Sequence, residues 1–87
     1  MIIEMLNEEK WYVYIITCND QSLYTGITKS IKKRLEKHAC GKGAKYTKGR
    51  LPVKLVYKEI HSSHSKAASR EFEIKSMTRA KKIKLFS

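Results

Sequence analysis

Residues 11–18 are the most constraining stretch of this sequence, because an almost unbroken run of aromatic and β-branched side chains is typical of a buried strand. The run reads WYVYIITC, so we expect a strand that is buried on both faces or nearly so. Turn-forming residues follow at positions 19–22, and residues 23–28 have the composition of a second strand. The sequence therefore predicts a β-hairpin over residues 11–28. Gly26 in its second strand indicates a bulge or a close approach of another group to the backbone.

A helix is predicted directly after the hairpin. Thr28 or Ser30 can cap its first turn, and Gly41 is expected to end it. Its apolar side chains recur with helical spacing on one face: Ile31, Leu35 and Ala39. Residues 41–52 hold three of the four glycines and the only proline, Pro52. We therefore expect this segment to be a mobile basic loop.

The second half of the chain reads as a strand followed by a helix. Residues 53–60 alternate between apolar and lysine side chains, which predicts a third strand with one solvated face. Serines at positions 62, 63 and 65 can cap a second helix that is expected to run to about residue 78 or beyond. Residues after Ala80 either continue this helix or form a basic tail.

The order of these elements, β-β-α-β-α, predicts an α+β fold with a small sheet. At 87 residues, the chain is expected to be a single domain over residues 1–87, with a core over about residues 11–80 and residues 1–9 as a loose leader. A chain this short buries only about 60–65% of its unfolded surface. We therefore expect one shallow site and no tightly bound organic cofactor.

Positive charge is concentrated in one segment of the chain. The formal net charge is +11, from 19 Lys and Arg against 8 Asp and Glu. Between Lys29 and Arg50 there are nine basic residues and one acid, Glu36, whereas the first ten residues hold three acids and one lysine. Segregated charge of this size favours a polyanionic partner over a surface that is basic only for solubility. Of the polyanions that such a charge could meet, DNA, RNA or an anionic membrane, we expect the partner to be nucleic acid.

The cysteines and the apolar runs of the sequence indicate the cellular compartment in which the protein works. Cys18 and Cys40 are not the close pairs of a zinc knuckle, and both are expected to be reduced thiols. The N-terminus lacks a basic region followed by a long apolar stretch, so no signal peptide is predicted. No apolar run approaches the ~20 residues that span a bilayer. The sequence therefore predicts a cytoplasmic protein without a membrane partner.

The predicted second helix carries an acid at a position where an apolar side chain is expected. At about 100° per residue, its apolar residues form one broad arc: Ala67, Ala68, Phe72, Ile74 and Met77. Glu71 falls near the middle of this arc, and Glu73 falls on the solvent side. An acid that faces the protein is costly unless it is paired, protonated or bound to a metal. Glu71 is therefore either part of an ion pair, with Arg70 or a nearby lysine, or a metal-binding or catalytic residue.

Two side chains of the first predicted helix are candidates for phosphate chemistry. Arg34 and His38 are four residues apart, so they lie on one side of the helix. Arg34 either clamps a scissile phosphate bidentately or only positions the backbone of the nucleic acid. His38 either shuttles a proton or binds a phosphate oxygen, or it has a structural role at the helix end. His61 and His64 are expected to be cap or surface residues.

The strand tyrosines allow two interpretations. Tyr12 and Tyr14 are two residues apart, so they share one face of their strand, and Tyr24 in the neighbouring strand can come alongside that face. Strand tyrosines are usually half-buried with a solvated hydroxyl. Residue type alone favours a structural role for each tyrosine, and the convergence of the rings adds support for a shared site.

The spacing of these residues resembles a known pattern. Tyr14 is followed by Tyr24 and Gly26, then by Arg34 eight residues after the glycine, and later by a helical glutamate. This order resembles the GIY-YIG nuclease superfamily over about residues 11–78. It looks most like the short stand-alone bacterial members, which carry a loop similar to HACGKGAKYT at positions 38–47.

The resemblance implies a three-stranded antiparallel sheet flanked by helices and a metal-dependent cleavage of DNA phosphodiester bonds. The catalytic residues that it implies by position are Tyr14, Tyr24, Arg34, His38 and Glu71. Glu71 would be the single protein ligand of one divalent ion, Mg²⁺ or Mn²⁺, and Gly26 would let the backbone pass closely.

The leading hypothesis is therefore a metal-dependent, structure-selective DNA endonuclease of DNA repair or processing. Glu71 would hold the ion together with water and phosphate oxygens, and Tyr14 or Tyr24 would orient the attacking water. Arg34 would stabilise the charge of the transition state. The residues expected to guide the nucleic acid strand are Lys33, Lys42, Lys45, Tyr46, Lys48 and Arg50.

The sequence departs from the family pattern in three places, and the absent asparagine together with the lone carboxylate supports an alternative. Tyr12 and Thr25 replace the usual glycine of the first motif and isoleucine of the second, and no asparagine follows the glutamate. The alternative is a nucleic-acid-binding module with little or no cleavage activity. A third hypothesis is an interaction protein that delivers a partner to DNA.

Overall fold

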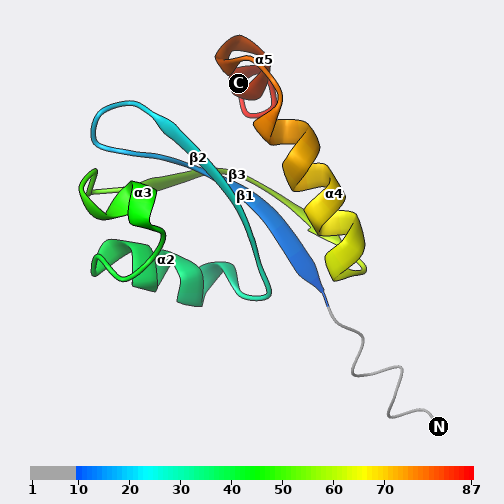
Figure 1. Ribbon diagram of the computed structural model, residues 1–87, viewed down its shortest axis with the longest axis horizontal. Helices are drawn as coiled ribbons and strands as arrows, with labels where there is room; N and C mark the ends of the chain where they lie inside the picture. The colour runs from blue at the N-terminus through cyan, green and yellow to red at the C-terminus, as the bar shows by residue number, and fades with distance from the viewer. Residues whose placement is uncertain (1–9) are drawn as a thin grey trace, which may run out of the picture.

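The computed structural model describes residues 10–87 and contains a three-stranded sheet with helices on both of its faces (Figure 1). The leader predicted over residues 1–9 lies outside the described residues. The strands are β1 (Trp11–Thr17), β2 (Leu23–Thr28) and β3 (Lys54–His61), and the helices are α2 (Ile31–Ala39), α3 (Lys45–Lys48), α4 (His64–Lys75) and α5 (Arg79–Lys84). The predicted α+β fold class is confirmed, and so is the antiparallel sheet that the resemblance implied.

β1 is the central strand, which explains why nearly every position in it is apolar. The strand order is β2-β1-β3, and the predicted hairpin is the β1–β2 pair. In Figure 1, α2 and α3 lie on one side of the sheet and α4 lies on the other. Alternate residues of β1 therefore face different helices. Tyr14, which is 1% exposed, reaches α2, and Val13 and Ile15 reach α4.

The apolar core lies between the sheet and α4. Val13 and Ile15 pack against Ala67 and Ile74, and all four side chains are fully buried. Burying one large aliphatic side chain contributes about 1.5–3 kcal/mol, so this face supplies most of the hydrophobic stabilisation. Phe72 was expected in the same arc but is 75% exposed. The expected arc was too broad, because five residues at 100° each place Phe72 about 140° from Ala67.

The first predicted helix is confirmed as α2, with one change on its buried face. Ser30 is its cap, since the Ser30 hydroxyl accepts from the Lys33 backbone N at 3.3 Å. Gly41 lies past the end of α2 with φ +78°, the left-handed conformation that suits a helix stop. Ala39 was expected on the buried face but is exposed, and the fully buried residue of α2 is His38. The buried position of α2 faces the Tyr14 hydroxyl, whose oxygen lies 3.0 Å from His38 Nε2.

Residues 41–52 are a structured segment rather than the predicted mobile loop. They contain the helical turn α3, in which Thr47 is fully buried. The segment is attached to the β1–β2 turn at two points: the backbone N of Asn19 donates to the carbonyl of Arg50 at 2.8 Å, and Arg50 Nε lies 3.0 Å from a carboxylate oxygen of Asp20. These contacts hold the basic segment against the hairpin.

The second predicted helix ends earlier than expected. α4 stops at Lys75, and Thr78 caps a separate helix, α5, by accepting from the Lys81 backbone N at 3.2 Å. Residues after Ala80 therefore neither continue α4 nor form a tail, because most of them belong to α5. The turn between the helices lets Leu85 and Phe86 pack against the core.

The remaining structural predictions have simple outcomes. β3 begins and ends one residue later than expected, and its lysines Lys54 and Lys58 are exposed as predicted. Cys18 is buried and Cys40 is exposed, and both are free thiols. Within residues 10–87, no helix has the length and apolar character needed to cross a membrane.

Candidate active site

The site begins with one pair of residues across the β1–β2 hairpin. Tyr14 on β1 is directly opposite Gly26 on β2. A Cβ atom at Gly26 would lie 2.6 Å from the Tyr14 hydroxyl oxygen and 2.8 Å from its Cζ. The phenol ring therefore lies across the backbone at Gly26, in a space that only glycine leaves open. This is the close approach that the glycine predicted.

The Tyr14 hydroxyl contacts two side chains of α2. Its oxygen lies 3.0 Å from His38 Nε2, and Arg34 Nε–H donates to the same oxygen at 3.3 Å. Arg34 and His38 are one helical turn apart, so α2 presents both to one strand residue. The side chains that the sequence placed on one side of this helix do meet Tyr14.

Burial sets the protonation states of this group. Desolvation raises the pKa of Tyr14, against the opposing effect of the hydrogen bond from Arg34. Desolvation also lowers the pKa of His38, and the positive charge of Arg34 lowers it further. Tyr14 is therefore a neutral phenol and His38 a neutral imidazole near pH 7. Arg34 keeps its charge, and its hydrogen bond to Tyr14 raises its own pKa.

Tyr24 is the second ring of the site, and its side-chain hydrogen bond with Arg34 is one of the causes that raise the pKa of Arg34, after the hydrogen bond with Tyr14. Its ring centroid lies 6.3 Å from that of Tyr14 and 5.5 Å from that of His38. On its other side it stacks with Tyr46 of α3, at 6.1 Å and an interplanar angle of 23°. Tyr24 thus joins the group formed by β1 and α2 to the aromatic residue of α3.

Glu71 lies on α4 and contributes a negative charge near this group. Its carboxylate forms an ion pair with Lys75 at 3.2 Å and is 22% exposed. Of the two partners considered from sequence, a lysine is therefore the one observed, and Arg70 pairs elsewhere. The charge of Glu71 raises the pKa of Tyr14, but less than burial and Tyr24 do. Glu73 is 63% exposed, as expected for a surface acid.

The donor set for a metal ion is sparse. Within residues 10–87, no group of three or more His, Cys, Asp or Glu side chains is arranged to hold an ion. A single partly exposed carboxylate fits Mg²⁺ or Mn²⁺ only if water and phosphate oxygens supply the remaining ligands, which is how Mg²⁺ is usually bound at phosphate sites. Glu71 fits that description, because its carboxylate is accessible and its Lys75 partner is on the surface.

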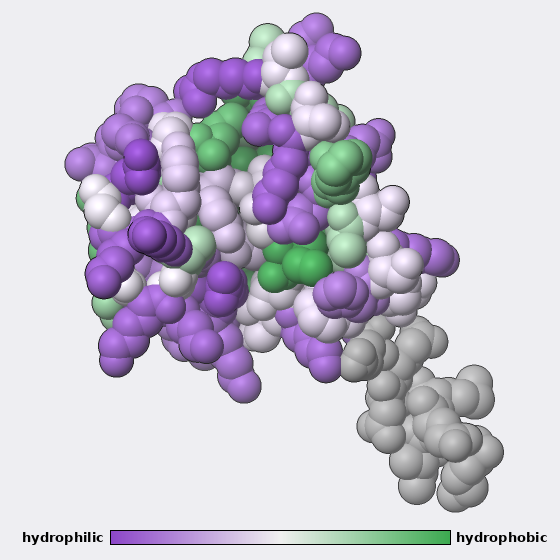
Figure 2. Space-filling model, viewed as in Figure 1, coloured by the Kyte–Doolittle hydropathy of each residue, from purple (hydrophilic) through white to green (hydrophobic). Residues whose placement is uncertain are grey.

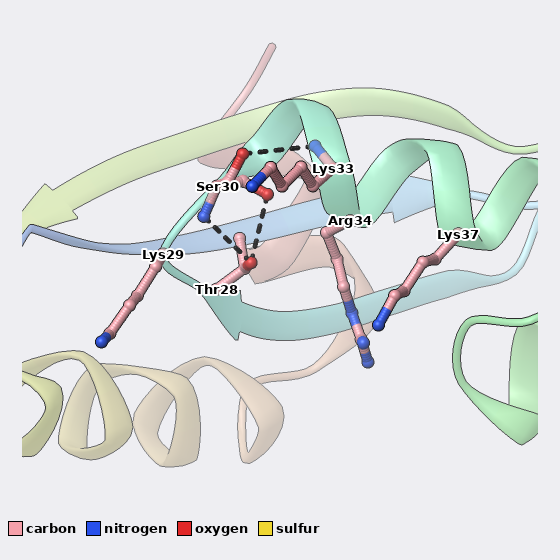
Figure 3. A pocket seen from close by; sticks show the side chains of 6 residues that line it. All are labelled: Thr28, Lys29, Ser30, Lys33, Arg34 and Lys37. Carbon is pink, nitrogen blue, oxygen red and sulfur yellow. Dashed lines mark hydrogen bonds between the residues drawn. The ribbon is translucent and has the colours of Figure 1, made fainter.

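A basic pocket of about 290 Å³ opens beside Arg34. Figure 3 shows Arg34 and Lys37 extending from α2 in the same direction. The lining residues come from the end of β2 and the first turns of α2: Thr28, Lys29, Ser30, Lys33, Arg34 and Lys37. Four cations and two hydroxyl groups around one hollow are suited to an anion the size of a phosphate.

The other residues expected to contact nucleic acid lie on or near α3. Lys42, Lys45 and Lys48 are exposed, and Figure 2 shows hydrophilic side chains over α2 and α3. Tyr46 is 40% exposed at the edge of this surface. Arg50 differs, because its guanidinium donates to the Tyr46 carbonyl at 2.7 Å and lies 4.0 Å from the Tyr46 ring centroid. Arg50 therefore contacts α3 through Tyr46, in addition to its ion pair with Asp20.

Two residues of this site were missed from sequence. Thr47 Oγ1 lies 2.8 Å from His38 Nδ1, and a Cβ atom at Gly43 would overlap the His38 ring. Both lie in the segment that was interpreted as a mobile loop. No local signal in the sequence marks Thr47, because its partner His38 is nine residues away and periodicity does not reveal the contact.

His61 and His64 also differ in part from the expectation. His61 Nε2 lies 2.7 Å from Glu59 Oε1, and the exposed His64 packs edge-on against Trp11 at 4.6 Å. Neither contacts the group around Tyr14.

Comparison with known proteins gives a consistent result. A sequence profile of the GIY-YIG catalytic domain matches residues 10–84. A UPF0213 protein of Staphylococcus saprophyticus is 56% identical over 79 residues, which is 91% of this chain and 96% of the relative. A UPF0213 protein of Staphylococcus aureus is 55% identical over 74 residues, which is 85% of this chain and 90% of the relative.

Two solved structures share the fold. The solution NMR structure of a UPF0213 protein from Bacillus halodurans is 47% identical and covers 87% of this chain and 81% of its own, with a TM-score of 0.57. The solution NMR structure of a protein from E. faecalis is 34% identical and covers 91% of this chain and 85% of its own, with a TM-score of 0.61.

Proposed function

The chain belongs to the GIY-YIG family of nucleases, and from that premise we propose that it is a metal-dependent endonuclease that hydrolyses DNA phosphodiester bonds. The observation that carries the proposal is the buried Tyr14 hydroxyl, held by His38 at 3.0 Å and Arg34 at 3.3 Å. A basic pocket adjoins this group through Arg34. A neutral proton-handling pair beside concentrated positive charge is suited to attack by water on a phosphodiester.

The proton of the attacking water is the first task of the site. Tyr14 is a neutral phenol near pH 7, because burial raises its pKa. It can take a proton from water only if its own proton leaves, and the contact with His38 gives that proton an acceptor. Tyr14 therefore serves as general base through His38, and no free phenolate is needed.

The charge of the phosphate is the second task. Arg34 is charged at all working pH values and lines the pocket, so its guanidinium can bind a non-bridging oxygen and stabilise the charge that grows in the transition state. Glu71 is the residue that would hold Mg²⁺ or Mn²⁺, and the bound ion would neutralise charge on the phosphate and the leaving oxygen.

The nucleic acid backbone would extend from the pocket across α2 and α3. Lys33 and Lys37 line the pocket, and Lys42, Lys45 and Lys48 are exposed beyond it. Contacts of this kind go to phosphates and carry no direct sequence information. We therefore propose selection by DNA structure, at branches or flaps, and a role in DNA repair or processing in the cytoplasm of a bacterium, since the relatives are bacterial proteins.

Cleavage of labelled single-stranded, duplex and branched DNA with Mg²⁺ or Mn²⁺ tests this proposal. Glu71→Gln keeps the shape of the side chain and removes the charge that an ion needs, so it should abolish cutting and retain DNA binding. Glu73→Gln is the matched control, because Glu73 is two residues away on the exposed side of α4. Equal cutting by wild type and Glu71→Gln would remove Glu71 from the mechanism.

A nucleic-acid-binding module without cleavage is the second candidate. The observation that favours it is the ion pair of Glu71 with Lys75, since a paired carboxylate is a weaker ligand. Fluorescence anisotropy with labelled DNA distinguishes the two functions. Tight, salt-sensitive binding in EDTA, with no product in any divalent ion, would favour the binding module.

A further inference from the structure

Thr47 is a fully buried hydroxyl next to the proton-handling pair. Its Oγ1 makes two short contacts, to the Ala44 carbonyl oxygen at 2.9 Å and to His38 Nδ1 at 2.8 Å. A carbonyl oxygen can only accept, so the single hydroxyl proton of Thr47 must point at Ala44. The other contact then requires a proton on His38 Nδ1, with the threonine oxygen as acceptor.

This arrangement decides which nitrogen of His38 is free. A neutral imidazole carries one N–H, and a proton on Nδ1 leaves Nε2 as an acceptor. The Tyr14 hydroxyl lies 3.0 Å from Nε2 and accepts from Arg34 Nε–H on its own lone pair. The phenol proton is then directed at Nε2. The hydrogen bonds run in one direction, from Arg34 through Tyr14 and His38 to Thr47 and the Ala44 carbonyl.

The surroundings keep the imidazole in this orientation. His38 is fully buried, so water does not compete for Nδ1. Gly43 passes so close to the ring that a Cβ atom at this position would overlap it. The segment with Gly43 and Thr47 therefore closes over one side of the ring, and β1 and β2 close over the other.

We infer that Thr47 is a positioning residue that holds His38 in the Nδ1–H tautomer, so that Nε2 is free to accept the proton of Tyr14. The tautomer of His38 is inferred from the hydrogen bonds alone. Its role in catalysis rests on the proposed function. Thr47 acts through His38 and touches no reacting atom.

The proton balance of the step follows from the tautomer. A water oxygen forms a bond to phosphorus and gives one proton to the Tyr14 oxygen, while the phenol proton moves to His38 Nε2. The bond from phosphorus to the leaving oxygen breaks, its electron pair stays on that oxygen, and a proton from solvent neutralises it. His38 is then an imidazolium with both nitrogens protonated, and its Nδ1–H is still bonded to Thr47. The other tautomer has no lone pair on Nε2 and blocks the transfer.

Long-range ¹H–¹⁵N NMR of the full chain measures the tautomer directly. Wild type and Thr47→Ser should show the proton of His38 on Nδ1, because serine keeps the hydroxyl. Thr47→Val has nearly the same shape without an acceptor, so the proton should move partly or wholly to Nε2. Thr25→Val is the matched control: Thr25 is 4% exposed and lies on the other face of the sheet, opposite Ile15.

Cleavage kinetics give the second measurement. Thr47→Val should lower kcat by roughly 10-fold to 100-fold with KM unchanged, which is less than the ~10² to 10⁴-fold that a positioned proton-transfer group supplies. Thr47→Ser should recover most of the rate, and Thr25→Val should leave it unchanged. Circular dichroism checks the fold of each variant, and Thr47→Ser and the wild-type spectrum remain decisive if Thr47→Val does not fold.

The two failures are distinguishable. A wild-type spectrum with the proton on Nε2, or a Thr47→Val spectrum identical to wild type, would overturn the inference whatever the activity. The expected tautomers in a protein that cuts no DNA would uphold the control of His38 by Thr47 and reject the nuclease proposal instead. Normal kcat for Thr47→Val with an altered tautomer would remove the tautomer from the mechanism.

Discussion

Two groups of polar side chains lie on opposite faces of the same sheet, and they use similar residues differently. On the α2 face, a tyrosine, a histidine and an arginine meet with no carboxylate: among residues 10–87, no acid lies within ion-pair distance of Arg34. On the α4 face, the corresponding residue types surround Glu59. That carboxylate accepts from Tyr57, lies 2.7 Å from His61 Nε2 and accepts from Arg70 Nε at 2.8 Å.

The two groups differ because Glu59 compensates the positive charge of the group on the α4 face, whereas no carboxylate pairs with Arg34 on the α2 face. Burial pushes the pKa of Glu59 up, but the hydrogen bonds that it accepts outweigh burial and lower it. Arg70 is also paired with Glu73 at 3.0 Å, so this group has its charges compensated and is suited to join β3 to α4. Arg34 keeps an uncompensated charge next to a basic pocket, so the α2 face is suited to an external anion such as phosphate.

Among variants of the two arginines and of Gly26, the largest expected effect is the loss of cleavage in Arg34→Ala. Arg34→Ala should lower kcat by about 10² to 10³-fold, the range seen when one donor to a transition-state oxyanion is removed. Arg70→Ala should leave the rate per folded molecule nearly unchanged. Single-turnover cleavage of branched DNA checks both, and equal losses would remove the functional distinction between the faces.

The close approach at Gly26 gives the next effect. Gly26→Ala should cost about 1–3 kcal/mol of unfolding free energy, because its Cβ would lie 2.6 Å from the Tyr14 hydroxyl oxygen. Gly49→Ala is the control, since nothing lies within 4 Å of a Cβ at that position. Urea denaturation of both variants measures the difference. A fully stable Gly26→Ala protein would show that Tyr14 does not lie across β2.

In stability, Arg70→Ala is expected to have the larger effect and Arg34→Ala the smaller one, the reverse of their effects on cleavage. Arg70→Ala leaves Glu59 partly buried with one donor fewer and should cost about 1–2 kcal/mol of unfolding free energy. The value is kept low because the Arg70 side chain is 24% exposed and the Glu59 side chain is 19% exposed. Arg34→Ala should cost less than about 1 kcal/mol, because Tyr14 keeps its contact with His38. The same urea experiment applies, and a larger loss for Arg34→Ala would contradict the structural assignment of the Glu59 group.

The smallest effect is a pH dependence from His38. Its pKa lies below the usual 6.5 in the folded chain, because of burial and then Arg34. Below pH 6.5 the unfolded chain therefore binds more protons than the folded one, and stability falls as the pH falls toward the folded pKa. Cleavage by the folded protein should decline only as the pH approaches the lowered pKa of His38, since a protonated His38 cannot accept. Thermal unfolding from pH 7.5 to 5 should show the loss in wild type and in His64→Gln, and a smaller loss in His38→Gln.

Sequence reasoning succeeded where the signal is local. The hairpin, the helix caps and the packing role of Gly26 follow from neighbouring residues, and the resemblance supplied the set of Tyr14, Arg34 and His38 that the structure brings together. The solvated position of Glu73 also followed from helical geometry.

The errors have a common physical cause. α3 has four residues and α5 has six, too short for a periodic signal or for stability in isolation. Tertiary contacts fix them, such as that of Thr47 with His38. The Glu59 group was missed for the same reason, because Arg70 is distant in sequence and comes from another element.

The most direct test of the account is a comparison of Tyr14→Phe and Tyr57→Phe in single-turnover cleavage of branched DNA with Mg²⁺. Each variant removes one hydroxyl from one of the two groups and keeps the ring. The account predicts a loss of about 10² to 10⁴-fold for Tyr14→Phe and a wild-type rate for Tyr57→Phe. Normal cleavage by Tyr14→Phe would contradict the claim that the polar group on the α2 face is the active site.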